Sequence, residues 1–333
     1  MHTKLFVLTL ISSVLFSITG FTTSNDTLKS IEKKHKKFLK KSNYVLIPAG
    51  RVSTSNYYEA ASRMPTPEVP VIQSTEIASF IMQKGEVTNK EYLDFLIYFK
   101  TKDPTYYQKI FPDTLVWRTP IAYNEPYVEH YLRHPSYQDY PVVGVSHQQA
   151  KMYCQWLTEK YNKNPDRIFK KVIYRLPTEA EWIYAAKGGN GHATFPWNGS
   201  YMRAGNGDLM ANSNQLGIEG IYRDTLYEKD PNGNFKEIYI YRAGPHNYMG
   251  AAGALNDAAD ITAPSISYWP NAFGLYNMAG NVCEMVAEQG ITHGGSWKDP
   301  GHYLQNQVRQ FYEGEESASS KRGFRYVIEV VEY

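Results

Sequence analysis

Cysteine is scarce in this chain, which has only Cys154 and Cys283 in 333 residues. So few thiols exclude a disulfide-rich scaffold and a zinc site built from several cysteines. The two residues are far apart in sequence, and in an oxidising compartment they could form one disulfide. Each is also compatible with a free, buried thiol, because cysteine commonly packs as a small apolar side chain. We favour two free, buried thiols.

A surplus of one charge sign is lacking as well. The chain has 35 Lys and Arg residues against 33 Asp and Glu residues, a formal net charge of +2. We therefore expect no nucleic-acid partner, since such binding needs a strongly basic surface. A composition of 42% hydrophobic and 20% charged residues is typical of a globular protein with a sizeable core. Tyrosine is abundant, with 28 residues, and suits either a partly wetted binding surface or exposed extracellular loops.

Long apolar runs are absent except near the N-terminus. There Lys4 precedes an uncharged run from Leu5 to about Phe21, and polar residues follow it. A short positive segment before an apolar one predicts a secretory signal peptide over residues 1–24. The run is short for a bilayer span, so we expect no transmembrane span in the mature chain; an uncleaved anchor is the alternative. No cysteine lies near the end of the run, which excludes lipid attachment there. We expect an exported protein of the periplasm or cell envelope.

The rest of the chain predicts one domain over residues 44–333, with no internal repeat. Before it, residues 25–43 are rich in lysine, which is typical of a solvated linker or a short surface helix. Contact of this stretch with anionic lipid or polysaccharide is a further possibility. Within the domain, residues 214–256 resemble an insertion. Its turn at residues 230–234, between tyrosine-rich arms, predicts a β-hairpin.

Capping boxes predict where helices begin. Each has a Ser or Thr N-cap followed three residues later by Glu or Gln. They are Thr88 with Glu91, Ser146 with Gln149, and Thr178 with Glu181. The pair Gly188-Gly189 predicts the end of the third helix. Short strands and loops rich in Gly, Pro and Asn surround these helices, so the pattern predicts an α+β domain with much irregular loop structure.

Seven sequence blocks, taken in order, resemble the sulfatase-modifying factor family, that of the formylglycine-generating enzymes. Together they cover about residues 44–330. The resemblance implies the formylglycine-generating-enzyme fold, a C-type-lectin-related α+β domain. The blocks are Ile47 to Gly50, Gly85 to Tyr92, Pro141 to Ser146, Arg175 to Trp182, Phe273 to Val282, Gly294 to Trp297, and Gly323 to Arg325.

A narrower similarity links the chain to Bacteroidetes proteins of the GldJ and GldK type. It is carried by Phe195 to Trp197, Tyr201 to Arg203, Ala211-Asn212 and Asn271 to Asn281. This similarity implies a function in gliding motility or type IX secretion. Those relatives are lipoproteins, whereas this chain has no lipobox cysteine.

The chain departs from the family's enzymes where their chemistry takes place. Those enzymes use two cysteines after a Gly-Gly-Ser motif to bind copper and to attack a substrate cysteine. Here Asp299 and Leu304 stand at the matching positions. A carboxylate is a poor ligand for Cu(I) and leucine is none, so we expect no copper and no formylglycine generation. A second branch of the family holds non-haem iron in an additional helical domain, of which this sequence has no sign. The resemblance therefore implies a pseudoenzyme.

Calcium is the metal that the resemblance does imply, at two sites. Oxygen ligands from loops, with a carboxylate among them, suit this cation. The first site would use the Asn277 side chain, the Gly280 and Val282 carbonyls and the Glu284 carboxylate. The second would use the Asn212 and Asp257 side chains and the Ser213 and Ala259 carbonyls. The alternative is that Asn277 and Glu284 only hydrogen-bond the loop backbone.

We predict a binding or assembly module whose partners are envelope proteins or a glycan. Its candidate interaction face comprises Trp297, Asp299, His302 and Tyr303, together with the tyrosine-rich insertion. The alternative function is an enzyme with a remodelled pocket, in which Asp299 and His302 act as acid and base. The remaining charged motif residues are predicted to be structural. They are Arg175, Glu179 and Glu181 around the third helix, and Arg309, Arg322 and Arg325 near the C-terminus.

Overall fold

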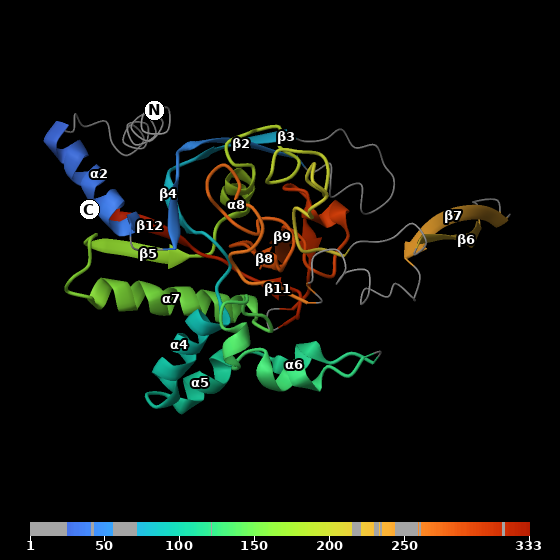
Figure 1. Ribbon diagram of the computed structural model, residues 1–333, viewed down its shortest axis with the longest axis horizontal. Helices are drawn as coiled ribbons and strands as arrows, with labels where there is room; N and C mark the ends of the chain where they lie inside the picture. Colours follow the sequence, from blue (N-terminus) through green and yellow to red (C-terminus); the bar gives the residue numbers. More distant parts are fainter. Residues whose placement is uncertain are drawn as a thin grey trace.

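The computed structural model describes residues 25–40, 43–55, 72–120, 122–214, 221–229, 233, 235–243, 259, 261–314 and 317–333. Helices and short strands are joined by long irregular connections, as the α+β prediction requires (Figure 1). Among the helices in these ranges, none is long and apolar enough to cross a bilayer.

The main sheet places the C-terminal strand between strands from the first half of the chain. It contains β1 (Tyr44–Ile47), β4 (Phe80–Gln83), β12 (Val327–Glu332) and β5 (Lys171–Arg175), in the order β1-β4-β12-β5. All three pairings are antiparallel, and Val327 lies opposite both Met82 and Arg175. Because every residue of β4 is buried, its run is apolar except for Gln83. The main sheet is therefore complete only when the C-terminal strand β12 has paired with β4 and β5.

Six α-helices are present among the described residues, and of these α2 and α7 contact the main sheet. The predicted capping boxes are present at the starts of α4 (Asn89–Lys100), α7 (His147–Lys163) and α8 (Glu179–Ala186). After α8 the chain turns at Gly188 and Gly189, both with positive φ, which confirms the predicted stop. The other helices are α2 (Asn25–Lys40), α5 (Pro104–Ile110) and α6 (Glu125–His130), with 3₁₀ turns η1 (Thr114–Trp117), η2 (Pro135–Tyr137) and η4 (Gly301–Leu304).

An aromatic core lies between α4, α7 and the main sheet. Tyr92 stacks on Tyr153 with ring centroids 5.5 Å apart, and Phe324 packs edge-on against Tyr153 at 5.6 Å. Cys154 is buried in the same cluster. Both cysteines are free and buried, as predicted. Burial raises the pKa of the Cys283 thiol to about 11, so it stays protonated near neutral pH.

A second, smaller sheet carries residues of the candidate site. It contains β10 (Gln310–Phe311), β9 (Ile291–His293), β8 (Cys283–Met285) and β11 (Arg322–Gly323), in that order. Strand β11 runs parallel to β8, and the other pairs are antiparallel. The two-stranded unit of β2 (Gly50–Ser55) and β3 (Ile72–Ile77) packs against α8. Arg325 lies in the short connection between β11 and β12, so it lies where the two larger sheets meet.

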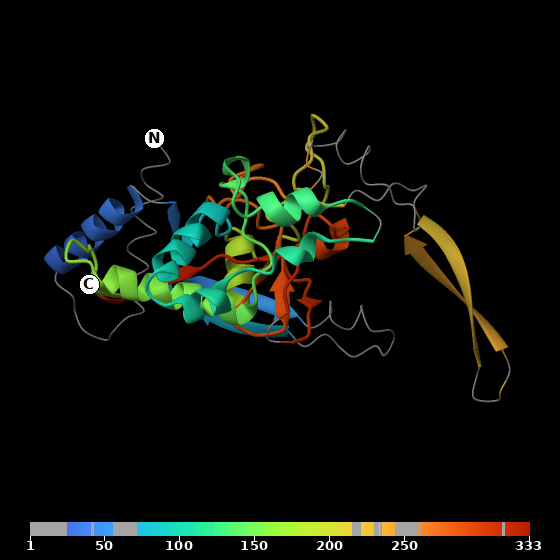
Figure 2. The ribbon, with the colours of Figure 1, turned by 90° about the horizontal axis from the view of Figure 1, so that it is seen from below.

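The hairpin predicted at residues 230–234 is present. Strands β6 (Ile221–Lys229) and β7 (Phe235–Ala243) pair antiparallel along their whole length, from Ile221 opposite Ala243 to Lys229 opposite Phe235. The hairpin extends away from the body of the molecule (Figure 2).

The lysine-rich stretch before the domain forms helix α2. Its Phe38 is buried, stacks on Tyr44 at 5.4 Å and contacts Phe169 at 5.1 Å. His35 is also buried, against the ring of Phe169. The sequence allowed either a solvated linker or a short surface helix for this stretch. The structure has the helix, and the apolar side of the helix packs on the main core.

Candidate functional site

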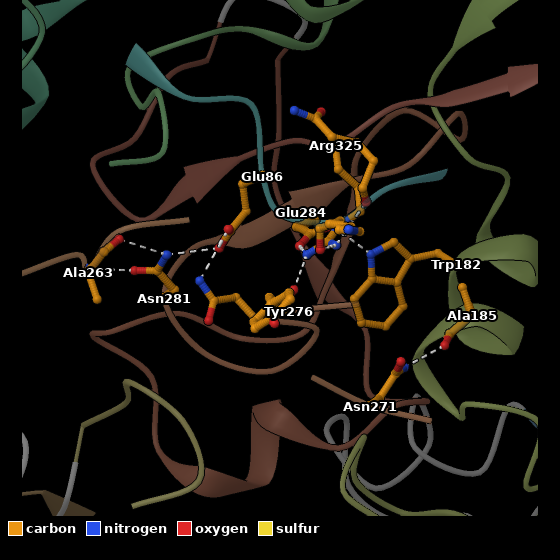
Figure 3. A network of polar contacts seen from close by, with 12 residues as sticks. Glu86, Trp182, Ala185, Ala263, Asn271, Tyr276, Asn281, Glu284 and Arg325 are labelled. Carbon is orange, nitrogen blue, oxygen red and sulfur yellow. Dashed lines mark hydrogen bonds and ion pairs between the residues drawn. The ribbon is translucent and has the colours of Figure 1, made fainter. Parts of the chain in front are cut away.

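A fully buried ion pair occupies the junction of the sheets. Arg325 and Glu284 are 0% and 1% exposed at the side chain, with Nη2 2.5 Å from Oε1 and Nε 2.6 Å from Oε2. Trp182 of α8 donates its indole N–H to Glu284 Oε2 at 2.8 Å (Figure 3). Both carboxylate oxygens are therefore occupied by donors. A buried pair is tolerated in this form, because each charge has a partner and further hydrogen bonds.

The same arginine joins residues 84–86 to the continuous segment 276–285, from which they are remote in sequence. It donates to the carbonyls of Lys84 at 2.9 Å and Tyr276 at 2.8 Å. Segment 84–86, loop 276–282 and strand β8 are thus held by one side chain. For Arg325, this confirms the prediction that C-terminal arginines tie the last strands to the core. Arg309 contacts Glu179, and Arg322 donates to Ser317.

Glu86 is the charged site residue that sequence reasoning missed. It is fully buried and accepts hydrogen bonds from the amides of Asn281 at 2.9 Å and Asn277 at 3.2 Å (Figure 3). Burial raises the pKa of its carboxyl from 4.5 to about 8; Arg325 lowers the pKa and Glu284 raises it. The sequence places Glu86 in a family block but gives no sign of burial, because its two partners lie almost 200 residues away.

The asparagines that hold Glu86 also fasten an irregular segment at residues 261–265. Asn281 accepts from the Ala263 N–H at 2.7 Å and donates to the Ala263 carbonyl at 3.1 Å. Asn277 donates to the Pro264 carbonyl at 3.2 Å. Both asparagines have left-handed backbones, with φ of 50° and 63°, a conformation that Asn adopts more readily than most residues. Loop 276–282 thus fixes the position of segment 261–265.

The residues predicted for the first calcium site divide into two groups. Asn277 Oδ1 is buried and has no hydrogen-bond partner among the described residues, as expected of an oxygen that faces a cation. Glu284, in contrast, is paired with Arg325, so a calcium ion would have to share that carboxylate with a guanidinium. Asn277 fits the ion and Glu284 in this arrangement does not. Gly280 and Val282, which would supply carbonyls, are buried in the same loop.

The second predicted calcium site is adjacent to the first. Asn212 and Ser213 are buried, and the Asn212 amide donates to the Ile261 carbonyl at 2.7 Å. The Asn281 N–H donates to the Asn212 carbonyl at 2.8 Å. Ala259 lies on the same side of the molecule, beside Ile261 in a pocket lining. Asp257, the proposed carboxylate ligand, is outside the described residues, so this site stays a prediction.

The two positions that match the catalytic cysteines hold side chains with structural contacts. Asp299 is 6% exposed, accepts from the Ser296 hydroxyl at 2.5 Å and forms an ion pair with Lys321 at 3.1 Å. Leu304 is 0% exposed and packs in an apolar cluster with Phe195, Ala211 and Ala279. One position is therefore filled by a carboxylate paired with Lys321 and the other by hydrocarbon. Neither presents a thiol.

The four residues predicted as one interaction face do not share an exposed surface. Trp297 is 9% exposed, stacks on Trp117 at 6.0 Å and donates its indole N–H to the Ser320 carbonyl at 3.1 Å. Asp299 is buried as described, whereas His302 is exposed and Tyr303 is half-buried. The prediction is corrected here, because the aromatic side chain of the Gly-Gly-Ser-Trp motif packs inward. Asp299 contacts Ser296 and Lys321, and His302 contacts Gln305, so the structure gives the proposed acid and base separate partners.

The carboxylates around α8 have structural roles, as predicted. Glu181 completes the capping box and pairs with Arg175 at 2.7 Å. Glu179 accepts from His293 at 2.9 Å and from Arg309. Burial of Glu179 opposes ionisation, but the hydrogen bonds from these two residues lower its pKa to about 2. It is therefore a permanent anion at neutral pH, unsuited to act as a general acid.

Comparisons with known proteins agree with this arrangement. Residues 29–330 match the family model described as sulfatase-modifying factor enzyme 1-like domain. The formylglycine-generating enzyme of Thermomonospora curvata is 31% identical over 150 residues, which cover 45% of this chain and 34% of that protein. The inactive C-alpha-formylglycine-generating enzyme 2 of Bos taurus is 26% identical over 200 residues, which cover 56% of this chain and 50% of that protein.

Among solved structures, Treponema denticola variable protein 1 aligns with a TM-score of 0.50 and 16% identity over 85% of this chain and 94% of that one. This likeness concerns the fold alone, and it confirms the predicted fold class. The matched segment spans only about a third of the length of the formylglycine-generating enzymes of Thermomonospora curvata (34%) and Bos taurus (29%).

Proposed function

Because the chain belongs to the sulfatase-modifying factor enzyme 1-like domain family, we propose that it uses this fold to bind a partner rather than to oxidise a cysteine. The observation that carries the proposal is the state of the two positions that match the catalytic cysteines. Asp299 is tied to Ser296 and Lys321, and Leu304 is part of an apolar cluster. No thiolate is available there to hold Cu(I). The similarity to the inactive C-alpha-formylglycine-generating enzyme 2 of Bos taurus gives the proposal a precedent.

The proposed place of action is the cell envelope, after export by the predicted signal peptide. Assembly of gliding-motility or type IX secretion components is the proposed process, on the strength of the resemblance in the Phe195 to Trp197 and Asn271 to Asn281 blocks. Pull-down of the tagged protein from envelope extract, followed by mass spectrometry, tests this. Recovery of secretion or motility proteins supports assembly. Recovery of none of them, in extracts where those proteins are abundant, contradicts it.

A direct assay tests the absence of oxidation. The purified protein is loaded with Cu(I) and incubated with a cysteine-containing sulfatase-motif peptide, beside an active formylglycine-generating enzyme as control. We expect no aldehyde product and no stoichiometric copper. Formation of the aldehyde would contradict the proposal. The alternative, an enzyme with a remodelled pocket in which Asp299 and His302 act as acid and base, is tested with other candidate substrates, and replacing both residues together should abolish any turnover of them.

Calcium is proposed as a structural ion of the Asn277 to Glu284 loop. Asn277 Oδ1 and the Gly280 and Val282 carbonyls would hold it, and its charge would brace the loop ends. An ion that binds only the folded state stabilises it and raises the melting temperature, by an amount that grows with the ion's concentration relative to its Kd. We therefore expect a higher melting temperature in calcium than in EDTA, and a smaller difference for Asn277→Gly, which keeps the left-handed backbone. Equal melting temperatures in calcium and EDTA would remove calcium from the proposal.

A further inference from the structure

A pocket of about 420 Å³ lies beside the Glu86 network. One side is formed by Tyr127 of α6, Tyr137 of η2 and the following Tyr140. The other side is the irregular segment from Ile261 to Tyr268 that Asn277 and Asn281 fasten. None of the described residues that line it is charged. The volume is within the range of small-ligand sites.

The tyrosines of the pocket are fixed before any ligand arrives. Tyr137 and Tyr140 pack edge to face, with ring centroids 5.3 Å apart and planes at 79°. Beneath them, the buried Tyr131 packs on Tyr137 at 5.3 Å and exchanges a hydrogen bond with the Thr262 hydroxyl at 2.7 Å. Both sides of the pocket are thereby joined through Tyr131. Such preorganisation lowers the entropy lost when a ligand binds.

Tyr268 has an unusual backbone at the rim. Its φ is 58°, in the left-handed region, where a bulky aromatic residue is uncommon. Strain of this kind lowers stability and clusters at ligand sites. A glycine or asparagine would satisfy this turn with less strain. The aromatic ring at this position is therefore retained against a cost in stability, which points to a function for the ring itself.

The backbone of the pocket wall has few free hydrogen-bonding groups. The Ala263 N–H and carbonyl are both bonded to Asn281, and the Pro264 carbonyl accepts from Asn277. The Ser265 N–H donates to the Asp139 carbonyl at 2.8 Å. An extended peptide recognised by strand addition needs such groups. A ligand must instead be recognised by ring faces and side-chain hydroxyls.

We propose that this pocket binds an uncharged saccharide unit. Tyrosine rings offer apolar faces for the C–H surface of a sugar, and tyrosine, serine and threonine hydroxyls exchange hydrogen bonds with its hydroxyls. Among the described residues, the lining offers an anionic or cationic ligand no counter-ion in a partly desolvated site. The proposal rests on the proposed function, since it names the ligand of a non-catalytic binding module.

The test uses the full mature chain and a panel of neutral oligosaccharides derived from glucan, mannan, galactan and chitin. Binding is screened on an array and measured by calorimetry for each hit. Tyr268→Gly removes the ring while relieving the left-handed strain, so it should fold at least as well as the wild type. Tyr140→Ala removes a second ring. Tyr201→Ala is the matched control, because Tyr201 is 82% exposed and lies outside the pocket lining.

We expect at least one neutral saccharide to bind the wild type and the Tyr201 control equally. Its Kd should rise at least tenfold in Tyr268→Gly and in Tyr140→Ala, with melting temperatures unchanged for the glycine variant. No binding to the panel, or binding that the pocket variants leave unchanged, overturns the proposal. So does a peptide that competes for the same tyrosines. If no saccharide binds but envelope proteins are captured equally by the wild type and Tyr268→Gly, the saccharide pocket fails while the proposed function stands.

Discussion

Asn281 shows how a single side chain can hold two loops in place. Its amide makes one hydrogen bond to Glu86 and two to Ala263, all buried, and its φ is 63°. We predict that Asn281→Gly costs about 2–4 kcal/mol of unfolding free energy, because three buried partners lose a bond while glycine keeps the backbone unstrained. Asn281→Ala should cost about 1 kcal/mol more, since alanine disfavours this φ. Urea denaturation measures both. Equal stability of the two variants would contradict the backbone argument.

Glu86 gives the molecule a pH dependence of known sign. Its carboxyl has a pKa of about 8 when folded, raised by burial from 4.5. Between these values the folded state holds a proton that the unfolded state has lost, so stability falls as pH rises from about 4.5 to about 8. We predict that Glu86→Gln makes stability depend less steeply on pH between these values. Melting curves in EDTA at several pH values compare the variant with the wild type. If the melting temperatures of the variant and the wild type changed equally with pH, Glu86 would be ionised in the folded protein.

The helix starts were predictable because the signal is local. A capping box places its two partners three residues apart, so Thr88, Ser146 and Thr178 identify their helices without any knowledge of the fold. The site was only partly predictable. Its loop motif could be recognised from the sequence. However, Glu284 pairs with Arg325, which is 41 positions away, and Glu86 accepts a hydrogen bond from Asn281, which is 195 positions away. The burial of Trp297 depends on Trp117, which no local pattern connects to it.

The cap of α8 provides a test at the scale of one element. The Thr178 hydroxyl accepts from the Glu181 N–H and donates to the Glu181 carboxylate. We predict that Thr178→Ala costs about 1 kcal/mol and that Thr178→Ser costs much less, since serine keeps the hydroxyl. Chemical denaturation distinguishes them. An equal loss for both variants would mean that the threonine methyl, rather than the cap, stabilises this end.

Helix α2 is the element whose packing could not be foreseen from its composition. Its lysines indicated a solvated stretch, but Phe38 is buried against Tyr44 and Phe169. We predict that Phe38→Ala costs about 3 kcal/mol of stability and speeds amide exchange in residues 31–40. Lys36→Ala is the control, since its side chain is 56% exposed and its pair with Glu32 is a surface ion pair of little worth. Unchanged exchange in Phe38→Ala would mean that α2 does not depend on this contact.

At the scale of the whole molecule, two deletions should have opposite results. Strand β12 lies inside the main sheet between β4 and β5, and Arg325 precedes it. Removing residues 324–333 leaves β5 without a partner strand, one edge of β4 unpaired and Glu284 buried without its counter-ion, so we expect no cooperative unfolding transition and an insoluble product. Replacing residues 221–243 with a short Gly-Ser linker should leave the melting temperature nearly unchanged, because Ile221 and Ala243 are paired neighbours at the base of the hairpin and the hairpin extends away from the body (Figure 2). Calorimetry of both variants measures whether each has a cooperative unfolding transition and at what temperature. A large loss of stability in the hairpin deletion would mean that the arm contributes to the core, and that the body does not fold by itself.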